Sequence, residues 1–147
     1  MKKYIGFLVL AIAFLNVSCD KCMEGDKAEP ASLFVDLLDE TTLENVFVNE
    51  TFTAQQISIK DLEDKLIPFV FVSNMSLIRI FPDTQNPLEN TFIITLNNDI
   101  TDVVKEITIT YDVEAIGQEC YTTYKTENVQ VPNNASEVID GIYRIKI

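Results

Sequence analysis

The sequence predicts an all-β protein, an antiparallel β-sandwich. Short runs rich in β-branched and aromatic residues recur from residue 32 to the end, and Pro, Gly, Asn or Asp interrupts them. One of these runs alternates apolar and polar residues with the period of two that marks a half-buried strand. No window combines a helical stripe with an N-cap and a glycine stop. We therefore expect eight or nine short strands in one domain.

The N-terminal half of this domain contains five expected strands, at residues 32–38, 45–49, 56–62, 66–72 and 76–81. Turn chemistry separates them, because Asp, Asn and Pro favour turn conformations over strands. The nine phenylalanines of the chain are expected in the core, with Phe69 and Phe71 on one face of their strand.

The C-terminal half contains strands at residues 90–96, 106–116 and 119–131, with a turn at Gly117, and a closing strand within 138–147. Alternation is clearest after Glu106, where we expect one face to be buried: Ile107, Ile109, Tyr111 and Val113. The closing strand repeats the pattern, with an expected buried face of Ile139, Tyr143, Ile145 and Ile147. The strand at 90–96 is apolar on nearly both faces.

The stretch LFVDLLDETTLENVFVN opens the domain with a strand, a turn and a second strand. This opening is common to immunoglobulin-like and transthyretin-like extracellular domains, so either form of sandwich is expected. The chain has no Trp, and the Cys…Trp…Cys pattern of true immunoglobulin domains is therefore absent.

The N-terminus has the features of an export signal. Lys2 and Lys3 precede an uncharged apolar run at residues 5–15. This run is shorter than the roughly 20 residues that a membrane-spanning helix needs, and it suits the apolar region of a secretory signal. It ends near Ser18-Cys19, within Asn16-Val17-Ser18-Cys19. This arrangement resembles a bacterial lipoprotein signal, whose lipobox usually reads Leu-(Ala/Ser)-(Gly/Ala)-Cys.

The resemblance implies a signal peptide at residues 1–18, lipid on Cys19, an acidic tether at 19–31 and a sandwich domain at 32–147. The tether is polar and contains Gly and Pro. Alternatives are an ordinary cleaved signal peptide and an uncleaved N-terminal anchor. The acids Asp20, Glu24 and Asp26 resemble signals that send lipoproteins to the cell surface, so we expect a surface-exposed outer-membrane protein.

The charge of the chain argues against nucleic acid as a partner. Removal of residues 1–18 takes away two lysines and leaves nine basic and 23 acidic side chains, a net charge of −14. Nucleic-acid binding depends on basic contacts to phosphate. The acidity also argues against an additional electrostatic attraction to anionic lipid.

The chain has three cysteines. With Cys19 lipidated, Cys22 and Cys120 form an even pair in an oxidising compartment, and we expect a disulfide between them. Two free thiols are the alternative, because separation in sequence does not report the distance between Cα atoms.

The chain lacks the residues that most catalytic mechanisms need. The chain has no histidine, which excludes Ser-His-Asp and Cys-His systems and His-ligated zinc. Its four glycines are not clustered, so it has no phosphate-binding loop. No catalytic residue and no cofactor is therefore predicted, and the acidic turn after Asp61 is expected to be solvated.

Two ligand classes stay open. Acidic loops of sandwiches suit calcium, which takes 6–8 oxygen ligands, and Asn98, Asp99 and Asp102 are the candidates. For carbohydrate, Tyr121 and Tyr124 are the candidates for stacking on a sugar ring. In one strand these two positions point to opposite faces, so packing at the edge of the core is the competing role.

As a whole the chain resembles the small envelope lipoproteins of Bacteroidota, of flavobacterial type. The resemblance rests on the lysine-led signal, the cysteine, the acidic tether, and a last third that reads EITITYDVEAIGQECYTTYKTENVQV and then GIYRIKI. It implies a single β-sandwich and no active-site residue. The hypothesis from sequence is a lipid-anchored, non-enzymatic interaction or accessory module with a protein or glycan partner in the envelope. The alternative is a carbohydrate-binding module of a surface glycan-utilisation system.

Overall fold

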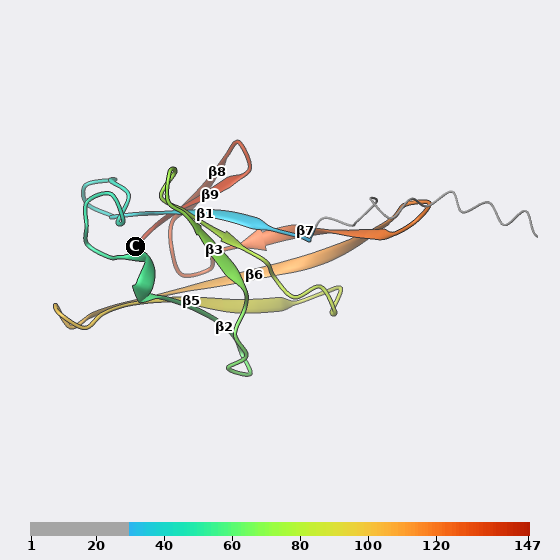
Figure 1. Cartoon of the computed structure of the whole chain (residues 1–147), viewed down its shortest axis with the longest axis horizontal. Helices are drawn as coiled ribbons and strands as arrows, with labels where there is room; N and C mark the ends of the chain where they lie inside the picture. Colours follow the sequence, from blue (N-terminus) through green and yellow to red (C-terminus); the bar gives the residue numbers. More distant parts are fainter. Residues whose placement is uncertain (1–29) are drawn as a thin grey trace, which may run out of the picture.

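The structure, a computed structural model, describes residues 30–147. The predicted signal peptide, Cys19, Cys22 and nearly all of the tether lie outside these residues. Two sheets lie against one another (Figure 1), which confirms the predicted all-β sandwich. Sheet A has five strands in the order β3-β4-β1-β9-β8, and sheet B has four in the order β2-β5-β6-β7. A single 3₁₀ turn, η1 (Ala54–Gln56), precedes sheet B's first strand, and no α-helix occurs among residues 30–147.

The strands of sheet A are β1 (Leu33–Leu38), β3 (Phe69–Val72), β4 (Leu77–Ile80), β8 (Ser136–Ile139) and β9 (Ile142–Lys146). The strands of sheet B are β2 (Ile57–Asp61), β5 (Asn90–Asn98), β6 (Val103–Gly117) and β7 (Thr122–Gln130). Neighbouring strands pair antiparallel, except that β9 lies parallel to β1.

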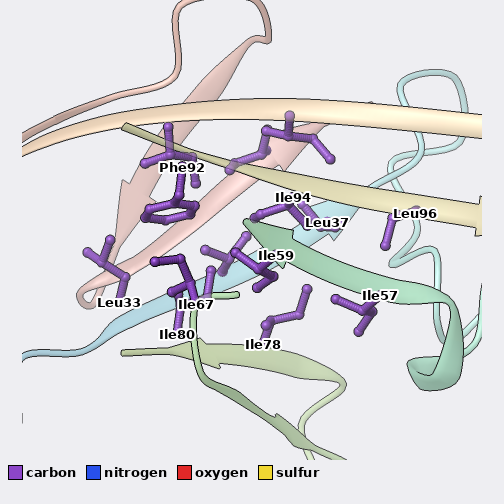
Figure 2. Packing of buried hydrophobic residues seen from close by; sticks show 14 of the residues in the cluster. Leu33, Leu37, Ile57, Ile59, Ile67, Ile78, Ile80, Phe92, Ile94 and Leu96 are labelled. Carbon is purple, nitrogen blue, oxygen red and sulfur yellow. The ribbon is translucent and has the colours of Figure 1, made fainter. Parts of the chain in front are cut away.

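The core fills the space between the inner faces of the two sheets, as Figure 2 shows. Aliphatic side chains dominate it, and many have no exposed surface. Sheet A contributes Val35, Leu37, Ile78, Ile80 and Ile145, and sheet B contributes Ile59, Phe92, Ile94, Leu96, Ile107 and Ile109. The alternation predicted for β6 is confirmed, since its four predicted inward residues are all buried.

The predicted strand at 45–49 is wrong. Asn45 makes one isolated bridge to Leu38, and the chain then turns. The Asn45 side chain causes the turn: its Oδ1 accepts from the backbone N–H groups of Phe47 (2.8 Å) and Val48 (3.1 Å). A side chain that bonds its own backbone competes with the strand ladder. Val46, which is 1% exposed, and Phe47 still pack against the core, whereas Val48 is exposed.

The closing segment is a hairpin, so the predicted single strand is wrong. Asp140 and Gly141 connect β8 to β9 with φ values of 51° and 79°. Positive φ at both central residues is the geometry of the tight turn that suits twisted strands. The reversal pairs Ile139 with Ile142, so Ile139 lies on the outer face of sheet A, 39% exposed, and not on the predicted buried face.

Two phenylalanines contradict the prediction that all belong to the core. Phe52 and Phe92 are buried, and Phe69 and Phe71 pack against the core from one face of β3 as predicted. Phe34 lies on the outer face of sheet A, because it alternates with the buried Leu33 and Val35. Phe81, directly after β4, lies on the same outer side, and the side chain of Arg79 is over both rings.

A two-stranded arm extends from sheet B. β6 pairs with β5 only as far as Tyr111, and continues to pair with β7 as far as Gly117. We call residues 114–125 the arm; Figure 1 shows it in orange, extending past the sandwich. Its tip is a four-residue loop closed by a hydrogen bond from the Gln118 N–H to the Tyr121 carbonyl (2.8 Å). β6 ends at the predicted turn residue, Gly117.

Candidate functional site

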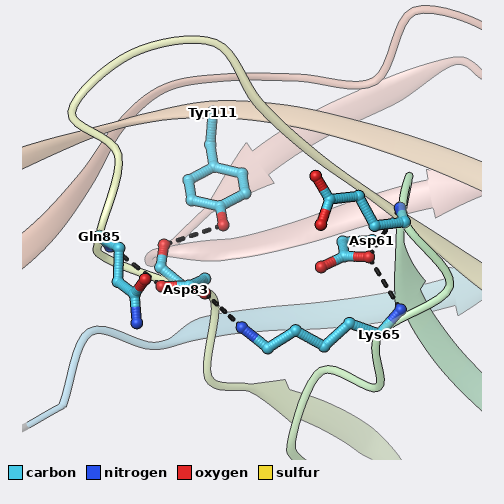
Figure 3. Close-up of polar contacts among 6 residues, drawn as sticks. Asp61, Lys65, Asp83, Gln85 and Tyr111 are labelled. Atoms are coloured by element: carbon cyan, nitrogen blue, oxygen red, sulfur yellow. Dashed lines mark hydrogen bonds and ion pairs between the residues drawn. The ribbon is translucent and has the colours of Figure 1, made fainter.

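A depression of the described surface lies where the loop after β2, the loop after β4, the start of β5 and the middle of β6 meet (Figure 3). It is an open pocket of about 340 Å³. Its acidic lining comes from Asp61, Glu63, Asp83 and Glu89, with Lys65 and Tyr111 also facing it. A pocket with several acids and one base raises the question of whether any group is available for chemistry.

Asp61 is occupied by its own loop. Its Oδ1 accepts hydrogen bonds from the backbone N–H groups of Glu63 (2.8 Å) and Lys65 (2.9 Å). Asp64, in the same turn, has a φ of 63°, which Asp tolerates better than most residues. The carboxylate of Asp61 therefore holds the turn between β2 and β3.

Lys65 and Asp83 both line the pocket and form an ion pair, with Nζ and Oδ2 2.9 Å apart. The hydrogen bond to Asp83 raises the pKa of Lys65 above its usual value. Reciprocally, the hydrogen bond from Lys65, followed by that from the Gln85 N–H, lowers the pKa of Asp83. Both groups are thus held in their charged forms at neutral pH, and Lys65 is largely exposed.

Tyr111 forms the floor of the pocket. Its ring is buried, 3% exposed, and its hydroxyl donates to the Asp83 carbonyl at 3.0 Å. Burial, together with the nearby charge of Asp83, raises the pKa of Tyr111 to about 12. A phenol with this pKa keeps its proton at neutral pH, so it is poorly suited to act as a general base.

Asp112 lies beside this pocket, in a second depression of about 220 Å³. Its two oxygens accept from the Asn128 Nδ2 (2.8 Å) and the Glu89 N–H (2.9 Å). These two bonds, the Asn128 bond first, lower the pKa of Asp112. Asn128 has a φ of 49° at the point where the register of β6 and β7 slips, so Asp112 braces a β-bulge.

The titratable groups share one property. In the described residues, every resolved pKa shift moves the group away from neutral pH: Asp39, Asp83 and Asp112 downward, and Lys65, Tyr111 and Tyr143 upward. General acid–base catalysis needs the opposite, a group whose pKa is moved toward the working pH. The carboxylates with resolved shifts are instead engaged in holding loops.

The two carbohydrate candidates lie on the arm. Tyr124 belongs to β7, pairs with Ala115, and is 39% exposed. Tyr121 lies in the loop before β7 begins, so the strand alternation that was expected to separate the two side chains does not apply to it. The structure places both near the tip of the arm, away from the acidic pocket.

The calcium candidates lie at the β5–β6 turn, at the opposite end of the molecule from the arm (Figure 1). The Asn98 Oδ1 accepts from the Ile100 and Thr101 N–H groups, and the Asp99 Oδ1 accepts from the Asn97 side chain. Asp102 has a φ of 55°. Within residues 30–147 no three acidic or cysteine side chains are grouped closely enough to hold a metal ion.

Cys120 lies in the loop at the tip of the arm. The other two cysteines lie outside the described residues, so lipid on Cys19 and a disulfide between Cys22 and Cys120 stay predictions.

Sequence reasoning missed the residues around Tyr111. Tyr111 was expected only as a core residue, and Lys65 and Asp83 stand 18 positions apart in two different loops. No local pattern links these two residues, because their contact depends on how β2 and β4 lie in separate sheets.

The chain matches no protein-family model, no curated protein and no solved structure. Among residues 30–147 there is also no helix of the length and apolarity needed to cross a membrane.

Proposed function

We propose that this protein is a lipid-anchored, non-enzymatic β-sandwich of the bacterial envelope that acts as an interaction or accessory module. The anchor rests on one observation, the lysine-led apolar run that ends at Ser18-Cys19. Several acyl chains on one cysteine hold a protein on a membrane far better than a single chain, at about 0.8 kcal/mol for each buried methylene.

The non-enzymatic part of the proposal is supported by the state of the pocket. Its ion pair, its buried tyrosine and its loop-holding aspartates have structural roles, and none of the resolved pKa shifts prepares a group for proton transfer near neutral pH. The chain's lack of histidine supports the same conclusion.

The anchor is tested by labelling cells with a palmitate analogue. The wild-type protein should be labelled and should fractionate with membranes, and Cys19→Ala should lose both properties. Cys22→Ser is the matched control, because it removes a neighbouring cysteine without touching the lipobox. Label that persists in the Cys19→Ala protein would contradict the proposal.

We place the protein on the outside of the outer membrane, on the strength of the acids that follow Cys19. Protease treatment of intact cells should then remove the sandwich domain. Full protection of the domain in intact cells, with digestion after lysis, would place it in the periplasm.

Carbohydrate binding is the second candidate function, favoured by the exposed Tyr124 on the arm. Aromatic rings stack on the apolar faces of sugars, and a tyrosine presents an apolar ring with a polar tip. A glycan array probed with the wild type and with Tyr124→Ala separates the two functions. Specific binding that the substitution abolishes would favour the carbohydrate module.

A further inference from the structure

The outer faces of the two sheets differ in chemistry. On sheet B, residues that pair across neighbouring strands form mainly polar rows, such as Thr91, Thr110 and Gln130, or Ser58, Thr95 and Glu106. This is the expected composition for a sheet face in contact with water. Sheet A does not follow the same rule.

One row crosses all five strands of sheet A on its outer face. The pairings run Val70 to Arg79, Arg79 to Phe34, Phe34 to Ile142 and Ile142 to Ile139. We call these five residues the outer row. Four of the five are apolar, and Val70 and Ile139 are 52% and 39% exposed. Apolar side chains gathered around one cation on the solvent-facing side of a sheet are a feature of interaction surfaces.

Arg79 is the single charge in this row, and it is held in place by two aromatic rings. The centre of its guanidinium lies 5.5 Å from the Phe34 ring centroid and 5.0 Å from that of Phe81. Both distances fall within the range of cation–π attraction. The guanidinium is therefore positioned before any partner arrives, which lowers the entropy that a partner's hydrogen bonds would cost.

Arg79 has no carboxylate partner among the residues that the structure describes. Within residues 30–147 no carboxylate lies within 4.0 Å of its nitrogens, and its Nε is buried without a hydrogen-bond acceptor. A buried donor left without an acceptor is costly. The neighbouring row differs, because Arg144 there pairs with Asp36 at 3.4 Å and Asn45 also bonds Asp36.

We propose that the outer row is the docking surface for a protein partner whose apolar contact surface presents one unpaired Asp or Glu carboxylate, with Arg79 as the anchor. This inference rests on the proposed function as an interaction module. Arginine and aromatic residues surrounded by apolar contacts are the usual centres of binding energy in protein interfaces. The partner's carboxylate would pair with the Arg79 guanidinium, for which residues 30–147 provide no carboxylate within 4.0 Å.

The charge of the chain favours this protein partner over a second copy of the chain and over an anionic membrane. A second copy of this chain is disfavoured, since each copy without residues 1–18 has 9 basic and 23 acidic side chains, a net charge of −14, and presents the same cation on the same row. An anionic membrane surface is repelled by the same net charge. A partner with one local carboxylate matches the cation directly.

The test places a photo-crosslinking amino acid at Val70 in the full chain, in the cells that make it, with Thr108 on the outer face of sheet B as the control position. We expect a discrete protein adduct from position 70 and none from position 108. Arg79→Glu should reduce the adduct at least roughly tenfold, because it places like charges together. Ile139→Asp, at the far end of the row, should also reduce it.

A charge-swap experiment gives the supporting result. Once the cross-linked peptide of the partner is known, reversing its acidic residue to Arg should restore the adduct with Arg79→Glu. A melting curve for each variant checks that the sandwich is still folded. An adduct that is indifferent to Arg79, or one formed with lipid, with the tether or with a second copy, overturns the inference. An adduct from position 108 alone would refute the docking surface on sheet A but would still support the proposed interaction module. The absence of an adduct from both positions would refute the docking surface and the interaction module together.

Discussion

At the scale of single residues, Tyr111 connects the core to the rim of the acidic pocket. Its ring lies against Phe92, with centroids 5.6 Å apart, and its hydroxyl holds the backbone at Asp83. The same side chain therefore stabilises the packing between the sheets and fixes the loop that presents the Lys65–Asp83 ion pair. Its raised pKa makes this role sensitive to alkaline pH.

We predict that Tyr111→Phe flattens the loss of stability at high pH. The folded pKa is about 12 against an unfolded value of 10.0, so the contribution is complete below pH 10 and is lost as pH rises toward 12. The phenylalanine variant should lose less stability across this range, and should be about 1 kcal/mol less stable at neutral pH because it lacks a hydrogen bond. Urea unfolding at several pH values measures both effects. Tyr124→Phe is the control for removing an exposed hydroxyl, and an identical alkaline loss in Tyr111→Phe would contradict the prediction.

A second residue-scale prediction concerns acid. The pKa of Asp112 is lowered from 3.8, so its contribution is present above pH 3.8 and is lost as pH falls through the folded pKa. Asp112→Asn should be less stable than the wild type at pH 6, and the difference should shrink as the solution is acidified. Thermal melts from pH 6 to pH 2 measure this convergence. A stability difference that stays constant over that range would show that the charge of Asp112 has no part in bracing the bulge.

At the scale of elements, turns decide how the strands are connected. The Asp140-Gly141 hairpin reverses the chain between β8 and β9, and allows β9 to lie parallel beside β1. The Asn45 turn instead removes a segment from strand formation. In both places one or two residues with specific backbone preferences overrule a run of apolar neighbours.

We predict that Gly141→Ala destabilises the sandwich and that Gly117→Ala does not. Gly141 has a φ of 79°, a conformation that costs a residue with a side chain about 1–2 kcal/mol. Gly117 has open space around it and no positive φ, so alanine fits there. The two variants make the same chemical change, and chemical unfolding compares them directly. Equal effects would contradict the assignment of the tight turn.

At the scale of the whole molecule, the arm bears Cys120 and the two tyrosine candidates, while the outer row lies on the opposite sheet. We propose that Cys22 and Cys120 form a disulfide that joins the tether to the tip of the arm. Such a bond would fix the orientation of the sandwich relative to the membrane, and with it the direction in which sheet A faces.

The Cys22→Ser, Cys120→Ser double variant should therefore melt at a lower temperature than the oxidised wild type. Chain-entropy reasoning assigns roughly 4 kcal/mol to a bridge over a loop of this size. Wild-type protein purified from the envelope should contain no reactive thiol apart from the lipidated cysteine. The idea fails if a thiol reagent labels both Cys22 and Cys120 in that preparation.

Much of the fold could be predicted from sequence, because a period of two is a local property. The alternation of Ile107, Ile109, Tyr111 and Val113 places a core face without any knowledge of partners. The Asp140-Gly141 hairpin was also available from sequence, since Asp-Gly between apolar runs is a strong hairpin signal. It was missed because the residues after Ile139 continue an apolar pattern that resembles one strand.

Other features depended on contacts between distant residues, and these only the tertiary structure decided. The outer row joins Val70, Arg79, Phe34, Ile142 and Ile139, and the pocket joins two loops from different sheets. No short window contains either set. The sequence by itself determined an all-β chain with an acidic surface and a core built from alternating strands. Strand order and register, which are set by packing across the whole domain, decided that Phe34 and Phe81 hold an arginine on the surface instead of filling the core.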